Sequence, residues 1–287
     1  MISMAIITSA LELGFIYALV ALALYLSFRV LNIADMTTDG TFTLGCAVSA
    51  TVALAGHPYL ALPAAMLAGA CAGVVTALLQ TRWGVPSILA GIITNTGLYT
   101  VNLAVMGFSS NVNMLRSETI FTPFMGMKLL PAAVITLVVA ALLVVFLSTR
   151  LGLSIRATGD NPDMVRASSI NTGLTITIGL ALSNSITALS GAVLAQYQKT
   201  ADISLGTGMV IIGLASLIIG ETVFRRGKLW VKVLSAVVGC ILYRFIIALA
   251  LRLDLPSECL KLVSAAIVAV AIALPTIKKT KGGKAKC

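Results

Sequence analysis

Charged residues are scarce in this chain: Asp, Glu, Lys and Arg make up 10% of its 287 residues, against about 25% in ordinary soluble domains. Hydrophobic residues make up 59%, and the mean hydropathy is +1.03. A soluble globule of this size would need a polar shell, so the surplus of apolar side chains must face lipid. The composition predicts an all-α, polytopic transmembrane helix bundle.

Catalytic and metal-binding residue types are also nearly absent. His57 is the only histidine, so neither a catalytic triad nor a histidine metal cluster can be assembled. The five cysteines are scattered without a CxxC pair, which argues against a disulfide framework and a zinc site. No GxxxxGK[ST] phosphate-binding loop occurs, so any ATP must be hydrolysed by another chain. We therefore expect no catalytic residues, metal or cofactor in this chain, and a membrane enzyme is the least favoured class.

Nine segments are apolar enough to be spanning candidates, given that about 20 mainly apolar residues cross the hydrocarbon. The first lacks a basic leader and a prompt cleavage site, so we expect it to remain as a helix rather than to be removed as a signal peptide. Two segments, 38–56 and 208–223, are rich in Thr and Gly or short, and either is a candidate for a broken or re-entrant helix. The nine predicted spans are 4–27, 38–56, 59–81, 87–107, 128–148, 173–196, 208–223, 231–252 and 259–276.

The basic residues predict the orientation of these spans, because Lys and Arg are enriched in cytoplasmic loops. Five lysines in the tail 277–287 mark the C-terminus as cytoplasmic, and nine spans then place the N-terminus outside. Fourteen of the twenty Lys and Arg residues fall inside, including Arg29, Arg82, the 149–172 loop and the loop that follows span 208–223. The net charge of +10 therefore reflects topology in a single domain, 1–287, rather than a nucleic-acid surface.

Two stretches resemble each other weakly. The run from Asp39, DGTFTLGCAVSATVALAG, and the run from Asp202, DISLGTGMVIIGLASLIIG, are each followed by a turn and a small-residue helix. The predicted topology makes them cross the membrane in opposite directions. Such an inverted repeat places a substrate path where irregular helices meet.

The loop 149–172, TRLGLSIRATGDNPDMVRASSINT, is long and charged, whereas the other predicted cytoplasmic loops are short. Asn161-Pro162 is a good helix start, since Asn accepts from free amides and Pro suits the first helical position. Asp163 would lie near the positive end of the helix dipole. We predict a short amphipathic helix over 162–169 whose Met164, Val165 and Ala167 insert into a groove of a soluble partner. A solvated connector with a capped turn is the alternative.

This loop resembles the cytoplasmic coupling loop of permeases in the branched-chain amino acid and ribose class of ABC importers. Their pattern, G-x-N-P-x-x-A-x-x-x-G-I-N, is matched at Gly159, Asn161, Pro162, Ile170 and Asn171. Ser169 stands where the pattern has Gly, which suggests a loosened close contact, and Val165 stands where it has Ala. The run RVLNIADMTTDGTFTLG is similar to the segment that leads into the second helix in the same family. Its TTDGTF motif resembles that of a single-permease subgroup linked to aromatic amino acid uptake.

The resemblance implies a permease of the bacterial inner membrane that works as a dimer, expected to be a homodimer, in the lipid bilayer. Its implied partners are two cytoplasmic ATP-binding cassette ATPases, which would hold the ATP and Mg, and an extracytoplasmic substrate-binding protein. The residues implied to couple to the ATPases are Gly159, Asp160, Asn161, Pro162, Asp163, Met164, Val165, Ala167, Ser169, Ile170 and Asn171.

Polar residues inside spans are costly and are therefore candidates for the translocation path. Helical spacing puts Asn95 and Tyr99 on one face and makes Asn184 and Thr187 neighbours. The alternative is that such residues only join helices to one another. Our predicted path residues are Thr38, Asp39, Asn95, Thr96, Tyr99 and Asn184.

Four ionisable residues lie at membrane depth or at its border: Glu12, Asp39, Glu221 and Arg244. Glu12 either pairs with Arg244 or faces a water-filled path. For Asp39, in Thr-Thr-Asp-Gly, we favour a structural cap at a helix start over a contact with substrate. An ion-coupled secondary transporter would use Glu12, Asp39 or Glu221 as its carboxylate, and is the alternative to ATP-driven import. The family resemblance implies an amino acid as the substrate, with a sugar or nucleoside as the other option.

Overall fold

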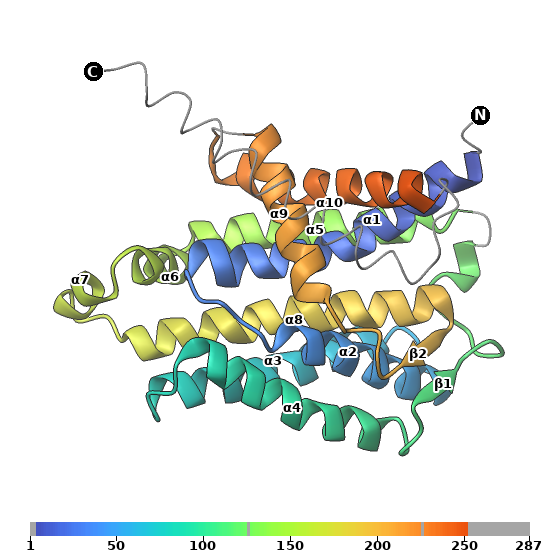
Figure 1. Cartoon of the computed structure of the whole chain (residues 1–287), viewed down its shortest axis with the longest axis horizontal. Coiled ribbons are helices and arrows are strands. Elements are labelled where there is room, and N and C mark those ends of the chain that lie inside the picture. Colours follow the sequence, from blue (N-terminus) through green and yellow to red (C-terminus); the bar gives the residue numbers. More distant parts are fainter. Residues whose placement is uncertain (1–3, 125–126, 225–226, 252–287) are drawn as a thin grey trace.

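The computed structural model describes residues 4–124, 127–224 and 227–251. Within them the chain forms a bundle of helices with one small antiparallel sheet (Figure 1). The elements of the first half are α1 (Met4–Leu24), the π-helix η1 (Tyr25–Val30), α2 (Thr38–Leu54), α3 (Ala61–Thr81), α4 (Ser87–Val105), β1 (Asn111–Asn113), the 3-10 helix η2 (Thr122–Phe124) and α5 (Leu129–Ser148). Those of the second half are α6 (Arg150–Asp160), α7 (Pro162–Ala167), α8 (Thr172–Gln198), β2 (Thr200–Asp202), α9 (Met209–Val223) and α10 (Leu229–Leu251).

Helices lie in eight of the nine predicted spans, with ends that differ by a few residues, and the all-α fold is confirmed. The ninth segment, 259–276, lies outside the described residues. Within the described residues, six helical stretches are long and apolar enough to cross a membrane, the longest being α8 with 27 residues. The other two, α2 and α9, have only 17 and 15 residues.

Both short helices follow irregular segments, but neither is broken: each of the candidate segments 38–56 and 208–223 holds one continuous helix. Residues 31–37 carry the chain from η1 back toward the middle of the bundle, where α2 starts, and residues 203–208 do the same before α9 (Figure 1). From there α2 runs toward the end that carries β1 and β2, whereas α9 runs toward the other end. Non-helical backbone at this depth is tolerated where neighbouring helices satisfy its polar groups, as Thr43 and Asp39 of α2 do for the amides of Gly206 and Gly208.

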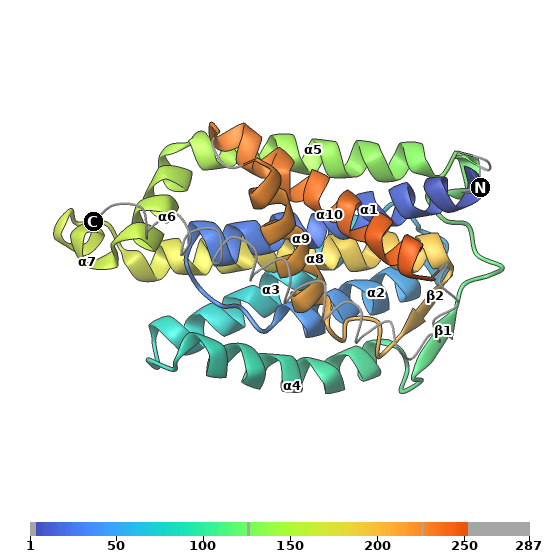
Figure 2. The same cartoon turned by 45° about the horizontal axis from the view of Figure 1, so that its top comes forward.

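The helices that follow α1 pack on α8, and the helices that follow α8 pack on α1. The pair α2 and α3 packs on α8, whereas the pair α9 and α10 packs on α1. Figure 2 shows α8 running between the outer helices α4 and α5. This crossed packing of two short helices with opposite directions agrees with the inverted repeat suggested by the runs from Asp39 and Asp202.

Glycine allows the backbones to approach closely where these helices cross. A Cβ on Gly45 of α2 would overlap the carbonyl oxygen of Ala188 of α8, and one on Gly191 of α8 would overlap the carbonyl oxygen of Phe42 of α2. Hydroxyl groups add hydrogen bonds between helices: Ser183 and Ser190 of α8 donate to the α1 carbonyls of Ala23 (2.8 Å) and Ile16 (2.7 Å). Small residues and serines are the usual means of joining helices where lipid removes the hydrophobic driving force.

The bundle has two different ends. At one end α6 and α7 project beyond the other helices, next to the ends of η1 and α3 and the start of α10 (Figure 1). At the other end β1 pairs with β2, and the buried side chain of Gln196 connects three segments through Ile120, Pro58 and Ser49. Arg29, Arg82, Arg156 and Lys232 belong to elements at the α7 end, so these basic residues from separate loops gather at one end of the bundle, as the sequence predicts.

Candidate functional site

The start of α2 is fixed by a buried polar cluster. Asp35, only 3% exposed, accepts from the amide of Thr37 (2.9 Å) and from the side-chain amide of Asn184 (2.7 Å). Thr41 donates to the Asn184 oxygen (2.8 Å), and Thr38 donates to the Asp35 carbonyl (3.2 Å). A buried carboxylate is tolerated when its oxygens are hydrogen-bonded in this way. The cluster ties the irregular segment before α2 to the middle of α8.

The carboxylate of Asp39 caps a helix, but a different one from that expected. It lies in the first turn of α2, and its two oxygens accept from the amides of Gly208 and Val210, both at 2.9 Å, at the start of α9. Gly208 has no side chain with which to cap α9, and the helix N-terminus favours a negative charge. A structural cap was therefore the right interpretation of Asp39, but the sequence suggested the wrong helix.

The predicted path residues of α4 lie on two sides of that helix. Five residues of α4 are buried where the helix packs on the chain: Ala90, Gly91, Thr94, Leu98 and Asn102. Asn95 is half-buried, and its oxygen lies so near Gly40 that a Cβ there would clash with it. Tyr99, 55% exposed, and Thr96 face outward. The structure therefore brings Thr38, Asp39, Asn95 and Asn184 around the start of α2 and leaves Thr96 and Tyr99 on the outer face.

Other polar side chains inside the spans join helices. Both groups of the Asn184 amide are used within the chain, and Thr187 donates to its own helix at Ser183 (3.1 Å). Glu12 accepts from the hydroxyl of Tyr197 (2.7 Å), and the guanidinium of Arg244 lies 3.7 Å from the centre of the Tyr17 ring. Of the two alternatives left open for Glu12, pairing with Arg244 is therefore wrong. Glu221, at the far end of α9, pairs with Arg29 of η1.

The segment 149–172 forms two helices rather than one. Thr149 caps α6 by accepting from the amide of Gly152 (3.2 Å), and the 11 residues of α6 were not predicted as a helix. Asn161 then accepts from the amide of Met164 (3.1 Å) at the start of α7, with Pro162 in the first turn, as its sequence indicates. Asn171 repeats this cap at the start of α8 with the amide of Leu174 (3.2 Å). Three local caps thus define the projecting α6–α7 element (150–167).

One face of α7 is free and the other is packed on its own chain. Met164 is 68% exposed, and Asp163 and Ala167 are exposed as well. Val165 is only 4% exposed, so the prediction that it inserts into a partner is wrong, because its side chain packs within this chain. The α7 helix ends at Ala167, two residues before the predicted end. The free apolar contribution of α7 is therefore Met164 with Ala167.

Backbone geometry explains two positions of the motif. Ser169, where the related pattern has Gly, has φ +60°, a left-handed conformation that glycine adopts at little cost. The glycine of the related pattern is therefore explained by the left-handed backbone at position 169, and not by a close packing contact that Ser169 would loosen. A Cβ on Gly159 would overlap the carbonyl oxygen of Val30, so Gly159 allows α6 to lie against η1. The neighbouring Asp160 lines a pocket between α6 and α10, and Ile170 is partly exposed between α7 and α8.

Sequence reasoning missed two residues of the central cluster. Asp35 lies two residues before Thr37 at a helix start, an arrangement in which Asp commonly binds the amide two residues ahead, and this signal could have identified it. Asn102 of α4 donates to the carbonyl of Gly40 (3.1 Å) and helps to hold the first turn of α2. Its partner lies 62 residues away, so no local pattern could have identified it.

Comparison with known proteins decides the family. Residues 6–273 match the family described as the permease component of the branched-chain amino acid transport system. The chain belongs to this family. Permeases of this family are membrane subunits of ABC transporters, which act with ATPase and substrate-binding subunits and are not themselves ATPases. The chain is accordingly a multi-pass inner-membrane protein of this transporter class.

Several relatives in this family carry substrate names. The chain is 33% identical to a tyrosine transport system permease protein of Clostridioides difficile, over 91% of this chain and 88% of that one. It is 22% identical to a ribose import permease protein of Haemophilus influenzae, over 86% and 78%. It is 29% identical to a D-allose transport system permease protein of Escherichia coli, over 71% and 63%. No solved structure gave a significant match.

Proposed function

We propose that this permease forms a homodimer that imports an amino acid, driven by two ATPases that dock on the α6–α7 element. The observation that carries the proposal is the form of this element. Three side-chain caps hold it in place, and it projects beyond the bundle with Met164 exposed and with Asp163 exposed beside Arg166. An exposed helix on a rigid support suits a groove on a soluble partner. The basic residues at this end support a cytoplasmic position.

The proposed path runs beside the starts of α2 and α9. Both helices begin in the middle of the bundle, and their first turns are joined by Asp39. On the adjacent outer face of α4, Thr96 and Tyr99 are exposed. The Thr96 hydroxyl donates to the carbonyl of Ile92 (2.9 Å), but the exposed phenol of Tyr99 suits a face that meets solute or the second copy. A movement of α9 relative to α2 would open or close the path at this junction, in the manner of alternating access.

An amino acid is favoured as substrate by the tyrosine permease, which matches this chain over the greatest share of its own length among these three named relatives. A sugar is the second candidate, because ribose and allose permeases also match. The path side chains are hydroxyls and amides that can hydrogen-bond either solute. We propose that the substrate-binding protein selects between them at the end that carries β1 and β2.

Reconstitution in proteoliposomes tests the proposal. The permease is combined with its ATPase and binding protein, and uptake of labelled tyrosine and of labelled ribose is followed with and without ATP. We expect tyrosine uptake that requires all three components. Uptake by the lone chain in response to an ion gradient would overturn the ATP-driven mechanism, and uptake of ribose alone would overturn the amino acid assignment.

A further inference from the structure

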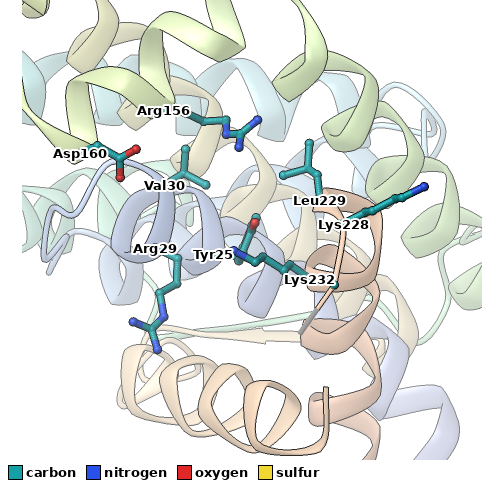
Figure 3. Close-up of a pocket in the computed structure, with 9 residues that line it drawn as sticks. Tyr25, Arg29, Val30, Arg156, Asp160, Lys228, Leu229 and Lys232 are labelled. Carbon is teal, nitrogen blue, oxygen red and sulfur yellow. The ribbon is translucent and has the colours of Figure 1, made fainter. Parts of the chain in front are cut away.

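A pocket of about 360 Å³ lies at the α7 end, where η1, α6 and the start of α10 meet (Figure 3). It lies away from the start of α2, and the proposed transport mechanism does not use it. Its lining contains four basic side chains, one carboxylate and one phenol: Arg29, Arg156, Lys228, Lys232, Asp160 and Tyr25.

The charges around this pocket are not balanced within the described part of the chain. Arg29 is paired with Glu221 of α9. Arg156, Lys228 and Lys232 form no ion pair with another described residue, although Asp160 lies at the edge of the pocket. Like charges gathered around a partly enclosed space repel one another, and a bound anion removes that repulsion.

Three polar groups converge in the pocket from different elements. Figure 3 shows the Arg156 guanidinium from α6, the Lys232 ammonium from α10 and the Tyr25 hydroxyl from η1 pointing toward a common space. Lys228 points away from it, and Arg29 turns toward α9. Tyr25 is buried, and its hydroxyl makes no hydrogen bond to another described residue.

This donor set matches a phosphate group. Arginine offers a planar fork to two phosphate oxygens, lysine adds a point charge, and the phenol donates a further hydrogen bond. Basic pockets between transmembrane helices near the cytoplasmic surface are typical sites for anionic lipid headgroups. The pocket lies at the border of the spans, since Tyr25 and Lys232 belong to helices that are candidate membrane spans.

We propose that Arg156, Lys232 and Tyr25 bind a phosphate group at the membrane surface, carried by an anionic phospholipid or supplied as free phosphate. The bound group would connect η1 and α10 to α6, the helix that leads into α7. It would therefore stabilise the present position of the α6–α7 element relative to the bundle. This binding is independent of the identity of the transported solute and of ATP.

Native mass spectrometry and thermal unfolding of the full-length chain in detergent test the site. Three additions are compared: phosphatidylglycerol, phosphatidylcholine and inorganic phosphate. The double variant Arg156→Gln/Lys232→Gln removes the two converging cations. Arg82→Gln is the matched control, because it removes one cation at the same end of the bundle but outside the pocket. Arg156→Lys and Lys232→Arg keep the charge. They test whether the double variant loses binding only because its fold is damaged.

For the wild type and Arg82→Gln we expect phosphatidylglycerol, but not phosphatidylcholine, to remain bound and to raise the unfolding temperature. The double variant should bind at least about tenfold more weakly, since each charge-assisted hydrogen bond accounts for roughly that factor. If inorganic phosphate raises the unfolding temperature of the wild type but not that of the double variant, the site is supported and free phosphate is a sufficient ligand. Equal binding by the double variant and the control, or no binding of any phosphate compound, would overturn the proposal.

Discussion

The helices α7 and α9 both begin after a break in the helical backbone, a single residue before α7 and a longer segment before α9, yet their first turns are stabilised in opposite ways. The start of α7 is capped by Asn161, three residues before the amide that it binds. The start of α9 is capped by Asp39, which lies 169 residues from Gly208 and 171 from Val210. The first cap is exposed at the tip of the bundle, and the second is partly buried between α2 and α9 in its middle.

The difference follows from the surroundings of each helix. Water can satisfy any amide that α7 leaves free, so a local side chain is sufficient and the other face of the helix remains available to a partner. The start of α9 lies within the bundle and is only partly exposed, so a free amide there is costly and needs an acceptor from a neighbouring helix. We therefore expect substitutions near α2 and α9 to lower stability, and substitutions on α7 to lower coupling.

The largest effect is expected where α2 and α8 touch. Gly45→Ala should lower the free energy of unfolding by about 3 kcal/mol, because the added methyl overlaps the Ala188 carbonyl and the backbones must separate. Thermal unfolding of the purified chain in detergent measures this loss. Gly97→Ala in α4 is the matched control, since nothing lies within 4 Å of its Cβ position and alanine favours the helix. Equal stability of the two variants would show that the close contact is not needed.

The cap of α9 should give the next largest effect. Asp39→Ala removes both acceptors for Gly208 and Val210, at a cost of about 2 kcal/mol. Asp39→Asn keeps one acceptor oxygen and should lose about half as much. Asp163→Ala, in the exposed first turn of α7, should change the unfolding temperature little. If Asp163→Ala were as damaging as Asp39→Ala, the contrast between the interior and the tip would be lost.

Substitutions on the exposed face of α7 should lower solute uptake and leave the stability of the chain unchanged. Met164→Glu places a charge where we propose an apolar contact with the ATPase, and uptake should fall about tenfold while unfolding is unchanged. ATP hydrolysis and solute uptake are measured together in proteoliposomes. Val165→Thr serves as the comparison, because it perturbs a buried side chain and should lower stability first. Full uptake by Met164→Glu would contradict the docking of α7.

The smallest effect is expected at the end of α7. Ser169→Gly should stabilise the chain by up to about 1 kcal/mol, since the left-handed backbone at φ +60° is strained for serine and relaxed for glycine. Ser169→Ala retains the strain and should bring no gain. The measurement is the same thermal unfolding, and a loss of stability in Ser169→Gly would show that the serine makes a contact worth more than the strain.

Much of the fold could be predicted because membrane helices are encoded locally. Long apolar runs locate α1, α3, α4, α5, α8 and α10 within a few residues. The Thr- and Gly-rich run at 38–56 and the short run at 208–223 marked the two short helices α2 and α9. The projecting helix α7 could be predicted from Asn161-Pro162, but α6 could not, because its sequence is polar and its helix depends on packing against η1 and α8.

The candidate site was predicted less completely. Asn184 and Asp39 were identified as polar residues in spans, but their partners, Asp35 and the amides of α9, were not. Val165 was assigned to a partner surface because a six-residue helix has no periodicity long enough to indicate which face is buried. Contacts of this kind depend on which helices lie side by side, and that information is not present in any local pattern.

The sequence by itself determined that the chain lies in a membrane, where its helices run, which end gathers the basic residues, and that Asn161 caps α7, since each of these follows from composition or from neighbours along the chain. Only the tertiary structure decided that Asp39 caps α9, that Asp35 binds Asn184, and that Arg156, Lys232 and Tyr25 meet in one pocket. The physical reason is the same in each case: a buried polar group must find its partner in space, and the crossed packing of the helices on α1 and α8 brings together residues that are far apart in the chain.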